Sequence, residues 1–424
     1  MKKFLALALA AAMSLSLVAC GGGNTSSPAA SSKPAASSGS SDVSTPAPAG
    51  NGDFKVGAIY ITSQNDVAGY TFQHHNGITT AMKDLGMDPA TQLLIVDNVA
   101  EDYDAVCSAI DTLANQGANV IFGISFGYID AMNDKAGEYT DICFSHGTGY
   151  MANDTNFNNY FGRIYQARYL AGIAAGMKSK ELGNNNIGYV AAYNTEYAET
   201  CSGINGFALG AQSANPDATV YVQKINTWGD ENLERQAAQA LIDTYNCGVI
   251  SQHCDSAQPQ LVAQENGAFG CGYNSDMTEQ APNAHLTAAI WHWNVYYQTA
   301  IEAAMACNGD AAKFVENMGG NAYYAGLAEG FVDASPVNEA TAAPNTAAVM
   351  DAVRELIKSG EWDVFTGVKL SYNISDDGKV EIIKTDADLV DADLNVIVAA
   401  GGPSVDDGVI KGSMDYNVAG VQEG

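Results

Sequence analysis

The feature of this chain that most constrains its fold is an alternation of short apolar runs with amphipathic segments, which occurs twice. The first pass predicts strands over 54–61, 93–96, 119–125 and 141–145, with helices over 70–85 and 104–116. The second pass predicts a helix over 166–180, then strands over 187–193, 219–225, 248–252 and 269–273 with helices over 201–212, 231–245 and 257–266. Strands that alternate with helices of this length form parallel sheets with right-handed crossovers, so we expect two α/β lobes.

The order of these segments predicts how the lobes share the chain. Residues 54–162 are expected to form the first lobe, and 163–276 the second. A helix predicted over 293–307 is expected to lie in a segment, about 277–310, that returns to the first lobe. Most of 320–424 is expected to be distributed over the second lobe and the hinge.

The N-terminus has the pattern of a bacterial lipoprotein signal. Lys2 and Lys3 precede an apolar run that ends at Leu17-Val18-Ala19-Cys20, and this run is short for a membrane span. Residues 1–19 are therefore predicted to be cleaved as a signal peptide, leaving Cys20 for lipid attachment. Residues 20–53, mostly Gly, Ser, Ala, Pro and Thr, are predicted to be a flexible linker. The alternative is an ordinary secretory signal with a chance cysteine.

Charge and cysteine usage argue against several classes of function. The formal net charge is −29 at pH 7, and so acidic a chain repels phosphate backbones and anionic headgroups. Nucleic-acid binding is therefore not expected. The eight cysteines include no C-x-x-C motif, and apart from Cys20 we interpret most of them as small buried hydrophobic residues. No metal-ligand spacing or complete dinucleotide fingerprint occurs, so neither a metal nor a cofactor is expected.

Aromatic, amide and acidic residues gather directly after the predicted strands. Open parallel sheets bind ligands beyond the carboxyl ends of their strands, and two lobes would face these ends across a cleft. Aromatic rings can stack on a flat ligand while carboxylates and amides read its edge. The candidate ligand-binding residues are Asp66, Tyr70, Phe72, Ser125, Phe126, Asn205, Trp228, His253, Asp255, Asn274, Asp276 and Trp293.

Different roles are expected within this set. Tyr70 and Trp293 are expected to stack on the ligand. Asp66, Asn205, Asp255 and Asp276 are expected to read its polar edge. One of the two residues Trp291 and Trp293 is expected to fill the core between the lobes rather than contact the ligand.

One short motif raises the alternative of catalysis. Residues Gly123 to Gly127 match G-x-S-x-G after a predicted strand, as in the nucleophile elbow of esterases. No H-G-G stretch precedes it to supply an oxyanion hole. We therefore favour a strand-to-helix turn in which Ser125 serves as a hydrogen-bonding residue, and we expect no enzyme.

Several stretches together carry a family resemblance over residues 54–424. They are Asp66 to Gly77, Ile124 to Tyr128, Gly162 to Gly172, Gly203 to Phe207, Gln252 to Ser256, Gly272 to Met277 and Met414 to Val421. With them the chain resembles the basic membrane protein family, the PnrA-like lipoproteins that bind purine nucleosides and related bases for ABC importers. The stretch 380–404 matches poorly and is interpreted as an insertion.

The resemblance implies a type I periplasmic-binding-protein fold, with two Rossmann-like lobes of parallel sheet joined by a three-crossover hinge. It also implies that Asp66 matches the family's first-lobe aspartate and that Tyr70 matches its base-stacking aromatic. Relatives often carry Asp where Asn274 stands and Lys where Trp291 stands. Both departures remove charges that could hold a ribose, so a free base becomes as plausible as a nucleoside.

The sequence therefore predicts a monomeric, lipid-anchored solute-binding protein on the extracytoplasmic face of the cell membrane. It would deliver a purine base or nucleoside to an ABC permease. Two alternatives stay open: a ligand sensor or surface lipoprotein of the same fold without a transporter, and a secreted serine esterase that uses Ser125.

Overall fold

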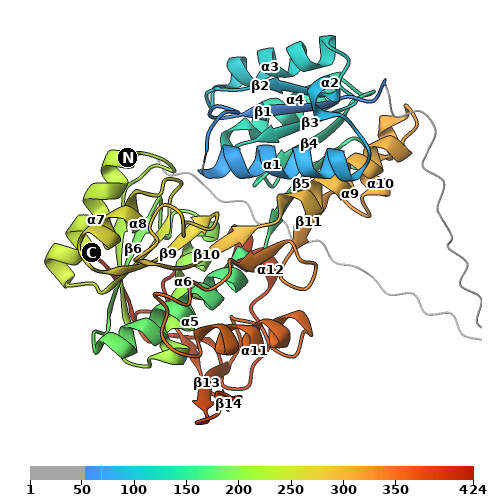
Figure 1. The fold of residues 1–424 in the computed structure, drawn as a ribbon. Coiled ribbons are helices and arrows are strands. Elements are labelled where there is room, and N and C mark those ends of the chain that lie inside the picture. Colours follow the sequence, from blue (N-terminus) through green and yellow to red (C-terminus); the bar gives the residue numbers. More distant parts are fainter. Residues whose placement is uncertain (1–52, 68) are drawn as a thin grey trace, which may run out of the picture. The chain divides into compact units, whose positions relative to one another are not determined.

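The computed structural model describes residues 53–67 and 69–424 (Figure 1). The predicted signal peptide, the predicted lipidation site Cys20 and nearly all of the predicted linker lie outside these residues, so those expectations remain predictions. Within the described part of the chain, no helix combines the length and apolar character needed to span a bilayer.

The first sheet has six strands, all parallel, as the sequence pattern predicted. Two of its middle strands, Val56–Tyr60 and Val120–Ile124, are buried along their whole length, which explains why their sequences are continuously apolar rather than alternating. In spatial order the strands are β11 (Ala322–Ala325), β5 (Phe157–Gly162), β4 (Cys143–Gly147), β3 (Val120–Ile124), β1 (Val56–Tyr60) and β2 (Leu93–Val96).

The second sheet has seven strands and is parallel except at one edge, where β12 runs antiparallel to β10. In spatial order the strands are β12 (Val332–Ala334), β10 (His285–Trp291), β9 (Phe269–Asn274), β8 (Val249–His253), β6 (Asn186–Ala191), β7 (Thr219–Lys224) and β17 (Val421–Glu423). The C-terminal strand β17 thus lies at the other edge, paired with β7.

Helices occur between the strands of both lobes. Those of the first lobe are α1 (Gly69–Asp84), α2 (Pro89–Gln92), α3 (Tyr103–Asn115), η2 (Phe126–Tyr128), α4 (Ile129–Glu138), α9 (Trp293–Ala306), η3 (Ala311–Lys313) and α10 (Phe314–Asn317). Those of the second lobe are α5 (Ile164–Leu182), α6 (Ala198–Ala214), α7 (Glu231–Tyr245), α8 (Gln258–Glu265), α11 (Thr346–Lys358) and α12 (Asp407–Gly412).

The chain passes between the lobes three times: from β5 into α5, from β10 into α9, and from β11 into β12. The two-lobed α/β fold with its three crossovers is therefore confirmed. The return to the first lobe differs from the expectation of about 277–310, because β10 still belongs to the second sheet. The return begins at Trp293, where α9 packs along α1.

The centre of the second lobe is the contact between α5 and α6, the most extensive between any two elements of the described chain. Glycines let these helices approach closely. A β-carbon added to Gly210 would lie 2.1 Å from the carbonyl oxygen of Tyr169, and one added to Gly172 would lie 2.1 Å from that of Phe207. The two helix backbones would have to separate to admit even a methyl group.

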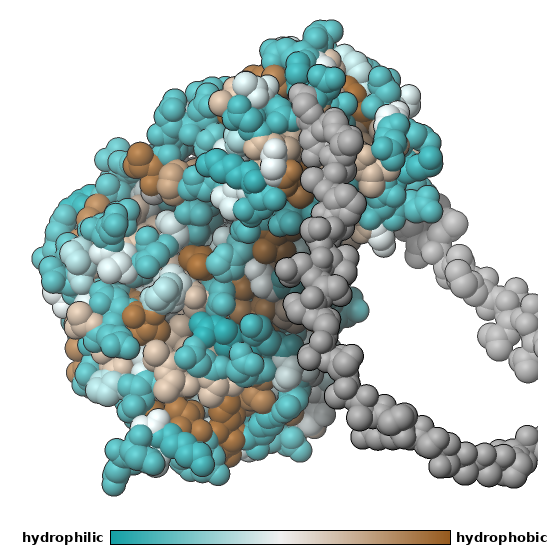
Figure 2. All heavy atoms as spheres, turned by 45° about the vertical axis from the view of Figure 1, so that its right-hand side comes forward, coloured by the Kyte–Doolittle hydropathy of each residue, from teal (hydrophilic) through white to brown (hydrophobic). Residues whose placement is uncertain are grey.

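The stretch 380–404, interpreted as an insertion, contributes to two small antiparallel sheets. One pairs β13 (Val368–Ile374) with β14 (Val380–Asp386), and the other pairs β15 (Leu389–Val390) with β16 (Val396–Val398). The first hairpin projects beyond α11 (Figure 1). Figure 2 shows that hydrophilic side chains cover much of one face, with hydrophobic residues gathered near its lower end.

The cysteines behave as the sequence suggested. Seven fall within the described residues, all as free thiols, and six of them are buried while Cys107 is partly exposed. They pack in the hydrophobic core, as Cys143, Cys201 and Cys271 do.

Candidate functional site

A cavity of about 1000 Å³ draws its lining residues from both lobes. The strand ends of the first sheet supply one part of the wall, and the strand ends of the second sheet, with α6 and α12, supply another. Its aromatic lining residues are Tyr70, Phe126, Tyr150, Phe161, Tyr193, Tyr197, Trp228, Tyr273, Trp291, Tyr323 and Tyr324. Its volume is at the upper end of the range common for small-molecule sites.

The central polar group of the wall is Asp255, two residues beyond the end of β8. Asn274, the last residue of β9, donates a hydrogen bond from Nδ2 to its Oδ1 at 2.9 Å. Burial raises the pKa of Asp255 to about 7, and the nearby carboxylate of Glu234 adds to the shift. The carboxyl group is therefore poised between its neutral and ionised forms near neutral pH.

Helix α1 begins directly against Asp255. Gly69 has φ +84°, and a β-carbon there would lie 3.1 Å from the backbone oxygen of Asp255. Only glycine satisfies both the left-handed backbone and this close approach. The next residue, Tyr70, lines the cavity, and burial raises the pKa of its hydroxyl well above the usual value. Thus a first-lobe ring lies beside a second-lobe carboxyl group.

A group of aromatic side chains forms another part of the wall. The ring of Tyr193 lies 5.1 Å from that of Trp228 and 4.6 Å from that of Tyr197. Phe126, from the first lobe, meets Tyr197 edge-on with the ring centroids 6.0 Å apart. Rings from the two lobes therefore meet beside the cavity, as clamping a flat ligand requires.

The contacts of Ser125 do not resemble those of a catalytic nucleophile. Its hydroxyl donates to Oε1 of Glu101 at 2.5 Å, and the same oxygen accepts from the backbone N–H of Gly127 at 2.8 Å. The neighbouring His146 places Nε2 2.7 Å from the backbone oxygen of Ser125 rather than beside its hydroxyl. A nucleophile needs its base at the hydroxyl, so this geometry gives the esterase alternative no support.

Behind the wall lies a buried group of charged residues. Nε2 of His253 lies 2.9 Å from Oε1 of Glu199, which lines the cavity. Arg168 is buried, donates to the hydroxyl of Tyr189 at 2.7 Å, and places its guanidinium 4.1 Å from the ring centroid of Tyr273. Burial and the charge of Arg168 lower the pKa of His253. Although burial raises the pKa of Glu199, His253 and Arg168 hold it below its usual value.

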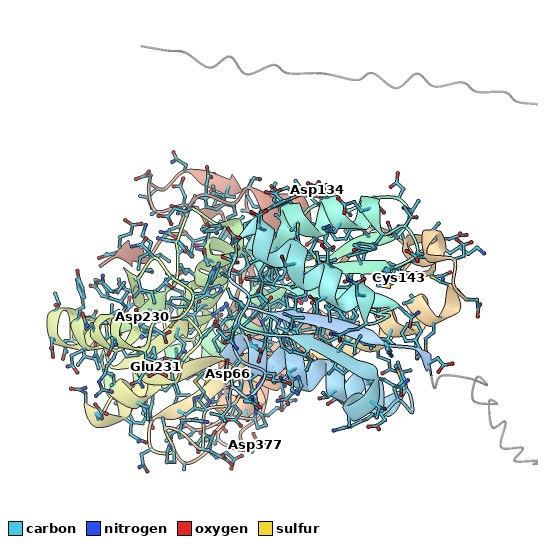
Figure 3. All side chains as sticks on the ribbon, turned by 90° about the horizontal axis from the view of Figure 1, so that it is seen from above. Asp66, Asp134, Cys143, Asp230, Glu231 and Asp377 are labelled. Atoms are coloured by element: carbon cyan, nitrogen blue, oxygen red, sulfur yellow. The ribbon has the colours of Figure 1, made fainter. Side chains whose placement is uncertain are left out.

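The structure brings five of the predicted site residues together in the cavity wall: Tyr70, Ser125, Phe126, Trp228 and Asp255. Two others lie immediately behind it, Asn274 through its bond to Asp255 and His253 through its contact with Glu199. Asp66 and Phe72 lie outside the wall. Asp66 accepts a hydrogen bond from Thr62 at 2.6 Å in the loop after β1, and Figure 3 labels it near the middle of the view.

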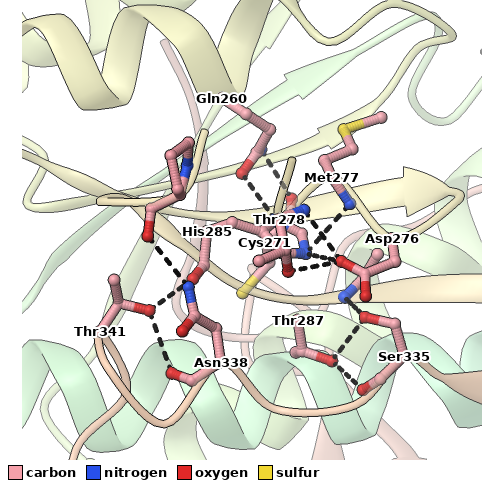
Figure 4. A network of polar contacts seen from close by, with 12 residues as sticks. Gln260, Cys271, Asp276, Met277, Thr278, His285, Thr287, Ser335, Asn338 and Thr341 are labelled. Carbon is pink, nitrogen blue, oxygen red and sulfur yellow. Dashed lines mark hydrogen bonds and ion pairs between the residues drawn. The ribbon is translucent and has the colours of Figure 1, made fainter. Parts of the chain in front are cut away.

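Three predicted residues have structural contacts that differ from the roles expected of them. Asn205 is buried and accepts from the backbone N–H of Val418 while donating to Tyr416, so it fixes the C-terminal segment. Asp276 accepts from Thr278 at 2.6 Å and lies 3.4 Å from the buried His285 (Figure 4). None of these contacts is with the cavity wall.

Trp293 is the third, and the structure reverses the expected order of the two tryptophans. Trp291 lines the cavity, whereas Trp293 is buried behind it with the two rings stacked 4.4 Å apart. Trp293 also stacks on His74 at 3.9 Å. Trp291 therefore faces the cavity, and Trp293 belongs to the core that supports it.

Sequence reasoning missed several residues of the wall. The carboxylates Glu101, Glu196 and Glu199 line it, and so does Lys411 of α12. Glu196 and Glu199 lie directly after β6, in one of the strand-end stretches in which the sequence predicts ligand-binding residues. No local sequence pattern indicates Lys411, because only the tertiary fold brings α12 to the cavity.

Comparison with known proteins places this geometry in a family. The family described as "ABC transporter substrate-binding protein PnrA-like" matches residues 54–359. The chain belongs to this family. Its members are extracytoplasmic substrate-binding components of ABC transporters, so a small-molecule ligand and a permease partner follow for this PnrA-like protein. The family is one of solute-binding proteins rather than enzymes.

Two relatives are similar at the sequence level. A purine-binding protein of Brucella abortus is 36% identical over 313 residues, which cover 74% of this chain and 83% of that protein. A putative ABC transporter glucose-binding protein of Haloferax volcanii is 41% identical over 201 residues, 47% of this chain and 50% of that protein.

Solved structures share the fold at lower identity. A solute-binding protein of Conexibacter woesei has a TM-score of 0.58 at 20% identity, covering 73% of this chain and 98% of its own. One from Aeropyrum pernix has a TM-score of 0.59 at 15% identity, covering 76% and 95%. The periplasmic-binding fold of this PnrA-like chain is thus shared with proteins of distant sequence.

Proposed function

We propose that this protein is a lipid-anchored solute-binding protein that captures a purine base or nucleoside in the cavity and delivers it to a permease. The observation that carries the proposal is the pairing of Asp255 and Asn274 among aromatic rings from both lobes. A carboxylate accepts hydrogen bonds from ring and exocyclic N–H groups, and the rings provide faces on which a flat heterocycle stacks.

The charge of the wall narrows the ligand class. Glu101, Glu196, Glu199 and Asp255 contribute carboxyl groups, whereas Lys411 is the one cationic side chain among the described lining residues. Such a wall disfavours phosphorylated ligands by like-charge repulsion. The relative named as purine-binding supports a neutral purine, whereas the half-length similarity to a glucose-binding protein supports a sugar.

The proposed ligand-binding residues are Tyr70, Ser125, Phe126, Trp228 and Asp255, joined by Glu199 and Trp291. Closure of the lobes on the ligand would stabilise the bound state, because the ligand contacts both lobes only when they are together. Contact between Phe126 and Tyr197 would contribute to this closed state.

Calorimetric titration with adenine, guanine, hypoxanthine, their nucleosides, pyrimidines and glucose tests the ligand class. We expect a measurable heat of binding only with the purine bases and purine nucleosides. Binding of glucose alone would overturn the purine assignment and leave the transport role intact.

The lipid anchor is proposed from Leu17-Val18-Ala19-Cys20. Expression in a bacterium fed an alkyne-tagged fatty acid should label the wild-type chain in the membrane fraction. The Cys20→Ser variant should lose the label, and retention of label by this variant would exclude Cys20 as the attachment site.

A further inference from the structure

Asp255 lies in a short loop whose conformation is fixed from behind the cavity wall. The buried side chain of Gln252 donates from Nε2 to the backbone oxygens on either side of it, those of Cys254 at 3.0 Å and Ser256 at 2.7 Å. The backbone N–H of Asp255 itself donates to the backbone oxygen of Trp228 at 3.1 Å. The position of this carboxyl group therefore depends on a side chain that does not line the cavity.

Glu234 of helix α7 holds the same loop through a second set of hydrogen bonds. Its side chain is fully buried, and its Oε2 accepts from the backbone N–H and the hydroxyl of Ser256 at 3.1 and 2.5 Å. Its Oε1 accepts from the backbone N–H of Asp230, the residue that precedes α7, at 3.2 Å. Both oxygens act as acceptors, which is the pattern of an ionised carboxylate.

The charge of Glu234 acts on Asp255. Burying a carboxylate is costly unless hydrogen bonds replace its lost hydration. Glu234 has three such bonds and lies in the first turn of α7, where the helix dipole favours negative charge. Burial raises the pKa of Asp255 to about 7 and the charge of Glu234 is the next largest contribution, whereas the bond from Asn274 lowers it. Repulsion between the two carboxylates thus favours the protonated form of Asp255.

The other titratable groups around Asp255 contribute less to this balance. Glu199 of α6 favours the protonated form as well, but by less than Glu234. Burial raises the pKa of the remaining groups that face Asp255 and keeps them neutral; these are the hydroxyls and the thiol of Tyr70, Tyr273 and Cys254. Glu234 is therefore the charged group whose removal should change the protonation of Asp255 most.

We infer that Glu234 is a positioning residue of the ligand site, which fixes the Asp255 loop and whose charge determines whether Asp255 donates or only accepts hydrogen bonds. This role rests on the proposed function and makes it more specific. A protonated carboxyl group presents one donor and one acceptor, and these complement adenine or hypoxanthine, whose pairing edges carry one of each. A carboxylate presents acceptors alone, which complement the two neighbouring N–H groups of guanine. The preference among bases should therefore change with pH.

Calorimetry of the wild type and Glu234→Gln with hypoxanthine and guanine, between about pH 5 and 8, tests the inference. In the wild type, the ratio of hypoxanthine to guanine affinity should fall as the pH rises through about 7, by up to about tenfold per pH unit because one proton is involved. In Glu234→Gln the fall should occur at a pH lower by about one unit. Glu231→Gln, an exposed residue of the same helical turn, is the matched control and should keep the wild-type profile.

Two further measurements separate the charge of Glu234 from its hydrogen bonds. Ser256→Ala removes one bond to Glu234 and keeps the charge, so it should weaken the binding of both bases by several-fold without moving the pH profile. The second measurement needs no ligand. The difference in melting temperature between Asp255→Asn and its parent protein should level off at a lower pH when the parent carries Glu234→Gln.

The same pH profile in the wild type and Glu234→Gln, an equal shift in Glu231→Gln, or unchanged affinities in Ser256→Ala would overturn the inference and leave the proposed function standing. If Glu234→Gln fails to fold, a pH-independent affinity ratio in the wild type would likewise overturn it. A wild type that binds neither base overturns the proposed function and the ligand preference with it. The ligand-free comparison then still decides whether Glu234 controls the protonation of Asp255.

Discussion

The side-chain amide of Asn274 donates a hydrogen bond to the carboxyl group of Asp255 across 2.9 Å. The bond joins the ends of two neighbouring parallel strands, β8 and β9, at the point where a ligand would enter the second lobe. Asn274 adopts φ +66°, a left-handed conformation that asparagine tolerates better than most residues.

Asp255→Asn should weaken purine binding by about 10- to 100-fold, because a hydrogen bond to a charged acceptor contributes about 1.5–3 kcal/mol. Calorimetry measures the effect. Asp377→Asn, in the turn of the β13–β14 hairpin (Figure 3), removes a carboxylate far along the chain from the cavity and should leave the affinity unchanged. Equal affinities in wild type and Asp255→Asn would contradict a ligand contact at this residue.

The stability of the unliganded protein should fall as the pH rises from about 4 to 7, through the titration of Asp255. Its pKa is raised by burial to about 7, so in this window the folded state binds more protons than the unfolded state. At about 1.4 kcal/mol per pH unit the contribution is roughly 4 kcal/mol. The melting temperature of Asp255→Asn relative to wild type should therefore increase between pH 4 and 7 and level off above. A difference independent of pH would show that Asp255 titrates normally.

Ligand binding should change the tryptophan fluorescence through the two tryptophans of the wall, Trp228 and Trp291. Replacement of Trp228 by Phe should reduce the change and weaken binding by several-fold, in line with about 0.5–1.5 kcal/mol for an aromatic contact. Trp362 packs against Tyr169 and donates to the backbone of Val368 at 2.8 Å, outside the cavity wall. Trp362→Phe should therefore preserve the fluorescence response, and its loss in this variant would place the binding site elsewhere.

Gly210→Ala should destabilise the second lobe by about 1–3 kcal/mol or more, because the new methyl group would collide with the backbone of Tyr169 on α5. The matched control is Gly137→Ala in α4, where an added β-carbon meets no atom within 4 Å. This substitution should stabilise by about 0.5–1 kcal/mol through helix propensity. Urea unfolding followed by circular dichroism measures both. A stable Gly210→Ala protein would show that α5 and α6 can separate.

The fold could be predicted from the sequence because most of it is local. The strand β2 and the helix α7 have the predicted bounds, since a continuous apolar run and helical periodicity leave direct patterns in the sequence. The strand β10 was missed because its run from His285 to Trp291 mixes polar and aromatic residues. Its two polar residues, His285 and Thr287, are satisfied by partners distant in the chain.

The residues of the cavity wall were predicted only where they directly follow strands of the two sheets. The residues that follow parallel strands lie together at one edge of the sheet, and Tyr70 and Asp255 are two such residues. The choice between Trp291 and Trp293 depends on how β10 passes into α9, which spacing alone does not determine. Asn205 shares the amide chemistry of a ligand-reading residue, yet the C-terminal segment occupies its hydrogen bonds. Long-range contacts of this kind leave no local pattern.

The pairing of β11 with β5 has a kinetic consequence. Asn159 and Ala322 are partners in this ladder, and most of the second lobe is encoded between them. The first sheet therefore gains its last strand only after the chain has been synthesised past Ala325. Closing so long a loop slows folding, because its entropic cost precedes the contacts that offset it. During synthesis the first lobe would remain incomplete, with the edge of β5 open, until the strands β6 to β10 of the second lobe have been made.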